Sequence, residues 1–473
     1  MTFARLASAA LSRRTLFNKT LFTLSAAALA TFSTASAGAP AAPAAAAADG
    51  VRPSPVRVID VPDSIEAAVA HALAEADQFA AAHPLHLRTM GSFMFGGTAD
   101  ILPSGETFHG DHGYAEYFVP QNAKNLPIVL WHGIGQSGKC FESTPDGREG
   151  FSAILPRLGW AAYIIDQPRR GRAGYTHVKP DGGTVPTILM ETAVWDAFRN
   201  GVWHPGDAAK VNAKTQFPAT PEGVDQFFRQ QTPDTGAEPQ VSRPHRIFLA
   251  RTMTKLFERT GPVILTTHSN SGQYGWETAM QNPGAVRAVI ALEPGAVSFP
   301  ESMRDKVKEA PYKNKDAAQA VQLQFVPDAD FDKLLKLPIL IVYGDNIATA
   351  PSDVFNEDVW RLSAYHAKLF VDEVNRRGGD AKLLHLPEAG LQGNTHAVYA
   401  DLNNLEVAQV ILDWLRQKGL DAADAPHAGP APQKAAGFTI PIDFSAIDKL
   451  INKKDVFLYF APPPFLNFIS ADA

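Results

Sequence analysis

Short apolar runs alternate along the chain with longer segments in which apolar residues recur at helical spacing. Six of the runs are rich in β-branched residues and are bounded by turn residues, as expected of strands buried on both faces of a parallel sheet. They cover 128–132, 161–166, 263–268, 288–293, 339–344 and 382–386. Helical patterns cover 246–259, 273–280, 363–377 and 405–417. This alternation predicts a doubly wound, mostly parallel α/β sheet, with residues 115–119 as an antiparallel leading strand.

Two long segments interrupt the alternation. Residues 176–244 are rich in Pro, Gly and Trp without a clear period, and residues 300–336 form a charged, partly helical insert. The first insert separates two predicted core strands, where a cap or lid over an active site would be inserted. We therefore predict a catalytic domain over 51–420 with a cap insert at 176–244, followed by a C-terminal extension, 421–473, to which no role is assigned.

The first 37 residues have the pattern of an export signal. Three arginines among the first 14 residues precede an apolar stretch, and Ala35-Ser36-Ala37 forms a small-residue cleavage site. The pair Arg13-Arg14 resembles a twin-arginine signal of bacterial export. The apolar stretch is too short for a stable membrane anchor, and residues 38–50 follow as an Ala/Pro leader of low complexity. A periplasmic or secreted protein is expected.

Composition narrows the classes of function further. The 473 residues are 45% hydrophobic and 19% charged, which is typical of a globular protein with a large core. The net charge of −6 leaves no basic surface of the kind that nucleic-acid binding requires. Cys140 is the only cysteine, so an intrachain disulfide is excluded, and we expect this thiol to be buried.

One predicted strand leads into a serine in a tight turn. Ser269 directly follows the run at 263–268, and the helical pattern at 273–280 comes after it. Strand, serine turn and helix form the context of a nucleophile elbow, which exposes the serine oxygen and aims backbone N–H groups at the reacting carbonyl. The usual G-x-S-x-G pattern is incomplete, because Thr267 and Ser271 occupy the glycine positions. A polar turn with a serine that caps the helix would have the same residues. The other motifs of the chain are needed to distinguish this turn from a nucleophile elbow.

A serine nucleophile needs a histidine base and an acid that orients it. His396 lies in a glycine-rich loop after the last predicted strand, where the α/β-hydrolase order of serine, acid and histidine places the base. Two acids are candidates: Glu293 ends the strand after the elbow, and Asp345 follows the next strand. Both are expected at the carboxyl edge of the sheet, and their spacing does not choose between them.

The loop after the strand at 128–132 offers the second donor of an oxyanion hole. The backbone N–H of Ile134 would join that of Asn270. Residues 133–138 of the same loop also fit G-x-G-x-x-G, which makes nucleotide binding an alternative. The alternative is disfavoured, because the glycines lead into a turn rather than a helix and Cys140 replaces the Ser or Thr of a P-loop. A metal site at 109–112 lacks a second group of ligands, so no metal is predicted.

Together these motifs resemble a group of exported bacterial α/β-hydrolase esterases with a Ser-Glu-His triad. The resemblance is carried by 268–272, 293–295 and 393–396, with further matches at 132–133, 144–148, 166–167, 170–172 and 403–405. In that group the triad acid is a glutamate after the strand that follows the elbow, so the resemblance favours Glu293 over Asp345. Some members carry paired cysteines after the His-Gly pair, where this chain has Ile134 and Gly135. The resemblance implies no particular substrate.

The sequence thus predicts the α/β-hydrolase fold with a cap insertion, and a serine hydrolase that cleaves small-molecule or polymeric carboxylic esters through an acyl-enzyme. No metal or organic cofactor is expected. Trp195 and Trp203 in the cap insert are candidates for lining the substrate pocket, although aromatic residues of an insert more often form its own core. An amidase or peptidase would use the same triad, and a non-catalytic α/β protein is the alternative from another class. Oligomeric state and acyl-chain length stay open.

Overall fold

The computed structural model describes residues 63–101, 104–174, 189–232, 242–308, 310–321 and 323–432. The chain divides into two compact units, Met1–Ala431 and Pro432–Ala473, and nearly all described residues belong to the first. The predicted export signal and leader lie outside the described residues, as do 176–188 and 233–241 of the cap insert and 433–473 of the extension.

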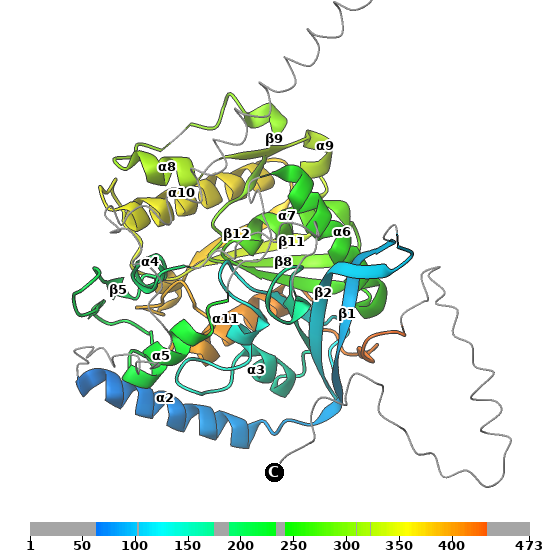
Figure 1. Cartoon of the computed structure of the whole chain (residues 1–473), viewed down its shortest axis with the longest axis horizontal. Helices are drawn as coiled ribbons and strands as arrows, with labels where there is room; N and C mark the ends of the chain where they lie inside the picture. Colours follow the sequence, from blue (N-terminus) through cyan, green and yellow to red (C-terminus); the bar gives the residue numbers. More distant parts are fainter. Residues whose placement is uncertain are drawn as a thin grey trace, which may run out of the picture. The chain divides into compact units, whose positions relative to one another are not determined.

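An eight-stranded sheet forms the centre of the first unit, in the order β1-β2-β4-β3-β7-β8-β11-β12 (Figure 1). The strands are β1 (Leu87–Ile101), β2 (Thr107–Pro120), β3 (Ile128–Trp131), β4 (Ala162–Asp166), β7 (Val263–His268), β8 (Val286–Leu292), β11 (Pro338–Tyr343) and β12 (Asp380–His385). β1 and β2 are antiparallel to their neighbours, and the other six strands are parallel. The predicted mostly parallel α/β sheet is confirmed, including its antiparallel leading strand.

Helices cover both faces of this sheet (Figure 1). One face packs against α6 (Arg243–Thr260), α7 (Ser271–Gln281) and α10 (Phe355–Arg376), and the other against α3 (Phe151–Arg157) and α11 (Asn404–Gln417). Alternate residues of a strand enter opposite layers: in β3, Val129 and Trp131 join the first apolar cluster, whereas Ile128 and Leu130 join the second. Burial on both faces explains why these strands are continuous apolar runs rather than alternating ones.

Among the elements absent from the sequence prediction, α2 and β1 are the longest. α2 (Asp63–Ala82) is alanine-rich and buries few large side chains, with Ile65 and Val69 in the cluster of α3 and α11, so its period is weak. β1 is interrupted by glycines, among them Gly96 and Gly97, and most of its other residues are half-buried or exposed. Neither element carries the apolar density by which a strand or helix is recognised in a sequence.

Residues 189–232 of the cap insert contain short elements that pack into the apolar cluster of α3 and α11. These elements are α4 (Glu191–Ala197), β5 (Gly201–Val202), β6 (Lys210–Val211) and α5 (Pro221–Arg229). α5 begins where the Thr220 side chain accepts a hydrogen bond from the Gly223 N–H, with proline in the first turn. Around α4 and α5 an aromatic cluster holds these short elements together.

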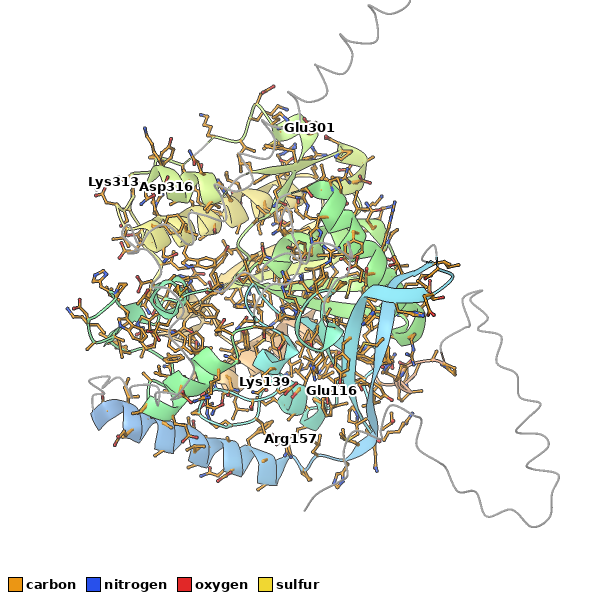
Figure 2. All side chains as sticks on the ribbon, in the orientation of Figure 1. Glu116, Lys139, Arg157, Glu301, Lys313 and Asp316 are labelled. Carbon is orange, nitrogen blue, oxygen red and sulfur yellow. The ribbon has the colours of Figure 1, made fainter. Side chains whose placement is uncertain are left out.

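The second insert adds β9 (Ser298–Pro300), α8 (Lys315–Ala320), β10 (Gln324–Val326) and α9 (Asp328–Phe331). β9 and β10 pair in parallel as a separate two-stranded sheet. In Figure 2 the side chains of Glu301, Lys313 and Asp316 lie at the outer margin of this insert, and all three residues are exposed.

After α11 the chain returns to the body of the domain. The Asn125 N–H donates to the Ala422 carbonyl over 2.8 Å, and the Ala431 N–H donates to the Arg259 carbonyl over 2.7 Å. The Tyr163 hydroxyl lies 2.8 Å from His427 Nε2. Residues 421–431 are therefore fastened to the domain that precedes them.

Candidate active site

Ser269 sits in a strained turn between β7 and α7. Its φ of 55° lies in the left-handed region, which is unusual for a residue with a side chain and costs on the order of 1–3 kcal/mol. The surroundings impose this conformation, since the Ser269 N–H donates to the Leu292 carbonyl over 3.0 Å and its own carbonyl accepts from the Gly272 N–H over 3.0 Å. Strand, strained serine and helix form the geometry of a nucleophile elbow.

The residues that replace the elbow glycines have structural roles. Ser271 is fully buried, its Oγ accepts from the His268 N–H over 2.9 Å, and it lies 3.0 Å from the Trp131 carbonyl oxygen. Ser271 thus ties the end of β7 to β3. The close approach of strand and helix is made possible by Gly275, because a Cβ there would lie 2.6 Å from Thr267 Cγ2. Thr267 stands where G-x-S-x-G has its first glycine, and Gly275 of the helix leaves the space that Thr267 needs.

His396 is held against Glu293 at the carboxyl edge of the sheet. His396 Nδ1 lies 3.1 Å from Glu293 Oε2, and both side chains are buried. The His396 ring packs against Trp360 with centroids 4.1 Å apart. Burial lowers the pKa of His396 below its usual value, although the bond to Glu293 raises it. A neutral imidazole oriented through Nδ1 leaves Nε2 to act as a base.

Glu293 is surrounded by donors. Arg199 forms a fork onto the carboxylate, with distances of 2.9 Å to Oε2 and 2.6 Å to Oε1, and the Gly344 N–H also donates to Oε1. Burial by itself would raise the pKa of Glu293, but the charge of Arg199 and the hydrogen bond from His396 lower it to about 2. The carboxylate is therefore ionised throughout the neutral range.

The structure places Asp345 in a turn. One carboxylate oxygen accepts from the Asn346 N–H over 2.7 Å and the other from the Gly393 N–H over 2.8 Å. Asp345 is half-buried. Of the two candidate acids, the structure brings Glu293 to His396, and Asp345 shapes the backbone of the loop that carries His396.

A buried network holds that loop from behind. Asp401 accepts from the Thr395 N–H over 2.8 Å and from the Thr395 hydroxyl over 2.7 Å. Burial raises the pKa of Asp401 to about 7, against the lowering effect of these hydrogen bonds. Arg148 donates to the Asp401 carbonyl over 3.0 Å and is itself paired with Asp146 over 2.7 Å. Asn394 donates to Asn403 Oδ1 over 2.6 Å, and Arg148 donates to Asn404 Oδ1 over 2.9 Å. Residues of the matching segments 144–148 and 403–405 thus support the histidine loop.

The residues proposed for the oxyanion hole flank Ser269. Ile134 and Asn270 line the same cavity as Ser269 and His396. The loop of Ile134 approaches closely, since a Cβ on Gly133 would lie 3.0 Å from Ser269 Cβ. Only glycine at this position lets the loop pass so near to the serine.

The glycine-rich loop is occupied by a carboxylate of the protein itself. Asp166 accepts from the Gly138 N–H over 2.5 Å and from the Arg172 N–H over 2.7 Å. A negatively charged phosphate would be repelled by this carboxylate, so the loop is unsuited to the nucleotide-binding alternative. Cys140 next to it is buried as expected, and burial raises the pKa of its thiol.

The cavity at Ser269 has a volume of about 140 Å³. Its wall is mostly apolar and comes from the cap insert, α10, the second insert and the loops at the sheet edge. The lining residues are Ile134, Leu189, Ala193, Val194, Ala197, Phe198, Ser269, Asn270, Gln273, Gly295, Ala296, Ala320, Val321, Gln324, Val359, Trp360 and His396. A small apolar group next to a reactive serine suits this space.

Trp195 and Trp203, the candidate pocket residues, lie elsewhere. Trp195 packs against Trp203 and Phe217 with centroids 5.7 and 5.4 Å apart. Their indole N–H groups donate to the carbonyls of Lys210 and Asp207. In the described part of the insert the two tryptophans thus form its own core, whereas neighbouring residues of α4 line the cavity.

The segment 109–112, which was considered as a metal site, contains an acid that pairs with an arginine. Asp111 forms an ion pair with Arg169 over 2.9 Å. Among the residues that the structure describes, no group of three or more His, Cys, Asp or Glu side chains is arranged to hold a metal ion. Within that same part of the chain, no helix combines the length and apolar character needed to cross a membrane.

Comparison with known proteins agrees with this fold. No family model matches the chain. It is 27% identical over 341 residues to a probable secreted lipase of Fungal sp. (strain ATCC 74256), covering 64% of this chain and 86% of that protein. A solved structure described as a novel bacterial esterase is 29% identical, with a TM-score of 0.56 and coverage of 71% of this chain and 97% of the other. The predicted resemblance to α/β-hydrolase esterases is confirmed, the similar proteins also include a lipase, and both support an ester hydrolase.

Three residues of the site were missed by reasoning from the sequence. Arg199 lies in an insert without a clear period, so nothing in its neighbourhood marks it. Trp360 lies in the first part of α10, ahead of the predicted helix at 363–377. Asp401 follows His396 by five positions, and its proximity to the predicted base was the one available signal.

Proposed function

We propose that this protein, which is similar to α/β-hydrolase esterases and lipases, is an exported serine esterase that hydrolyses carboxylic esters through an acyl-enzyme on Ser269. The observation that carries the proposal is the arrangement of one cavity: Ser269 and His396 line it together, and His396 Nδ1 lies 3.1 Å from the buried carboxylate of Glu293. The name of the fungal relative, a probable secreted lipase, supports export.

In the proposed reaction His396 accepts the Ser269 proton while Oγ attacks the ester carbonyl carbon. The N–H groups of Asn270 and Ile134 stabilise the negative charge that develops on the carbonyl oxygen. His396 then passes its proton to the departing alcohol, and an acyl-serine ester is left. Water, deprotonated by His396, attacks this ester and releases the carboxylic acid and the free serine. Glu293 stabilises the imidazolium in both halves of the reaction.

The cavity favours a short acyl group. Its volume of about 140 Å³ is smaller than the roughly 300–1,000 Å³ of pockets for drug-sized ligands. Trp360 from α10 and Phe198 from the cap insert narrow it beside His396. We expect acetyl and butanoyl esters to be turned over with a higher kcat/KM than dodecanoyl esters of the same alcohol. A rise in kcat/KM with chain length would contradict this proposal.

The function is tested with p-nitrophenyl butanoate and its anilide counterpart. Wild-type protein should hydrolyse the ester faster than the anilide, and Ser269→Ala should reduce ester turnover by about 10⁴-fold or more. A wild-type preference for the anilide would instead indicate an amidase.

Ser271→Gly is the matched control. It removes the other serine of the turn and introduces the residue that G-x-S-x-G elbows have at this position. Since Ser271 is buried behind the turn, its loss should lower stability more than it lowers turnover. Ester turnover that survives in Ser269→Ala and disappears in folded Ser271→Gly would overturn the assignment of the nucleophile.

A further inference from the structure

The cap insert is attached to the catalytic residues rather than hinged above them. The Phe198 carbonyl accepts from the His396 N–H over 2.9 Å, and the Ala197 carbonyl accepts from Trp360 Nε1 over 2.7 Å. Arg199, the next residue, reaches Glu293. Three consecutive residues of the insert thus contact the base loop, the cavity wall and the acid.

Arg199 itself has a strained backbone, and each of its three side-chain nitrogens donates a hydrogen bond. Its φ is 56°, a conformation that costs a residue with a side chain about 1–2 kcal/mol. The guanidinium donates to both oxygens of Glu293 and, through Nε, to the Asp345 carbonyl over 2.9 Å. Such strain persists where the surroundings require one placement of the side chain, and it often marks functional sites.

The fork fixes the plane of the carboxylate. Oε1 receives Arg199 and the Gly344 N–H, and Oε2 receives Arg199 and His396 Nδ1. A guanidinium that donates two parallel bonds prevents rotation of the carboxylate, which a single point charge does not. Arg199 and Glu293 are both buried, so the ion pair is shielded from water and salt.

We propose that Arg199, supplied by the cap insert, is a positioning residue that holds the Glu293 carboxylate in the orientation that His396 requires. The insert is then part of the catalytic machinery, because displacement of residues 197–199 would release the acid of the triad. This proposal rests on the proposed function for the roles of Glu293 and His396.

The positive charge of Arg199 makes the proposal testable in the pH profile of kcat/KM. The titratable or charged groups that face His396 from the elements around it are Glu293 after β8, Arg199 in the insert and His268 at the end of β7, and Asp401 lies behind Thr395. Removing the Arg199 cation increases the proton affinity of both His396 and Glu293. The acidic limb of the kcat/KM profile should therefore move to higher pH.

The experiment compares Arg199→Met with Arg199→Lys. Arg199→Met, which removes the charge and the fork, should lower kcat by about 10²-fold and shift the acidic limb upward. Arg199→Lys keeps the charge without the fork, so the limb should stay near that of wild type while kcat falls by about 10-fold. A fall in kcat with an unmoved limb in folded Arg199→Met would overturn the proposal.

Arg243→Met is the matched control. Arg243 also forms an ion pair with a buried glutamate, Glu277, over 3.2 Å, and with Asp330, but it is remote from His396 in its contacts. It should lower thermal stability and leave the acidic limb in place. An equal shift of the limb in Arg243→Met would show that any lost buried ion pair moves it, and would contradict a specific role for Arg199.

A second readout does not depend on turnover. The proton on His396 Nδ1, bonded to a carboxylate, gives a far-downfield proton NMR signal whose titration reports on this pair. Loss or an upward-shifted titration of the signal in Arg199→Met, with the signal retained in Ser269→Ala, supports the proposal even if the ester assay fails. A signal that titrates as in wild type would contradict it.

Discussion

Two neighbouring turns at the carboxyl edge of the sheet each carry an acid and use it differently. Glu293 follows β8 and Asp345 follows β11, and these strands pair in parallel. Glu293 is fully buried and bound by Arg199, Gly344 and His396. Asp345 is half-buried, and its carboxylate accepts from two backbone N–H groups. Similar positions on adjacent strands thus lead to different chemistry.

The difference comes from the partners of each acid. A buried carboxylate is stable as an anion only when a cation and several donors compensate for the lost water. Arg199 provides that compensation for Glu293 from an insert that lies about a hundred residues earlier in the sequence. The Asp345 backbone in turn holds Arg199 through its carbonyl. The second acid therefore supports the first without contacting the base.

The largest expected effect separates the two acids directly. Glu293→Gln keeps the shape of the side chain but removes the charge that orients and stabilises His396, so kcat should fall by about 10⁴-fold. Asp345→Asn should change kcat by less than about 10-fold, because the altered side chain contacts backbone only. Steady-state turnover of p-nitrophenyl butanoate measures both, and a larger loss at Asp345 would reverse the assignment.

A smaller effect on kcat is expected from a substitution at Gly344, where the turns that carry Glu293 and Asp345 approach each other. A Cβ at Gly344 would lie 2.7 Å from the Thr395 carbonyl oxygen and 3.0 Å from Glu293 Oε1. Gly344→Ala should therefore push the acid and the histidine loop apart, lowering kcat by about 10- to 100-fold and the free energy of unfolding by about 1–3 kcal/mol. Kinetics and urea unfolding test this. Wild-type kcat in the variant would show that the contact does not position Glu293.

Glu293 should also affect how the stability of the protein depends on pH in the acidic range. Its pKa is about 2 in the folded protein, against about 4.3 in an unfolded chain. A depressed pKa stabilises the fold above pH 4.3 by on the order of 3 kcal/mol, and this contribution is lost as the pH falls toward 2. Between pH 5 and 2, the free energy of unfolding measured with urea should fall less steeply with decreasing pH in Glu293→Gln than in wild type. Parallel slopes would contradict the depressed pKa.

The smallest effect is expected from removing the Asp345 carboxylate altogether. Asp345→Ala loses two hydrogen bonds to the N–H groups of Asn346 and Gly393. The Asn346 N–H belongs to an exposed residue and can bond to water instead, whereas the buried Gly393 N–H loses its partner, so the free energy of unfolding should fall by only about 1–2 kcal/mol. Thermal or urea unfolding checks this value. A loss as large as that caused by Glu293→Gln would mean that the two turns are equally critical to the fold.

Much of the fold could be predicted because buried parallel strands leave a strong signal. All six apolar runs correspond to strands, and their boundaries differ by at most two residues. β1 and α2 were missed because glycine and alanine carry little hydrophobic information. α10 begins at Phe355, well ahead of the predicted start at 363, because its first turns mix acidic residues with a few apolar ones.

The site could be predicted in part for a different reason. Ser269 and His396 follow strands in recognisable turns, so their convergence follows from the topology of the sheet. The spacing of residues does not choose between Glu293 and Asp345, although the resemblance favours Glu293, and it contains no information about Arg199. Trp195 and Trp203 were candidates for the pocket because they are aromatic, but their contacts place them in the core of the insert.

The central claim is that an acyl group is transferred to Ser269. Wild-type protein mixed briefly with p-nitrophenyl butanoate and quenched in acid should carry one butanoyl group, and peptide mass mapping should locate it on Ser269. Ser271→Gly should acquire the same adduct, and Ser269→Ala should acquire none. A butanoyl group on another residue, or turnover without any adduct in wild type, would contradict the account.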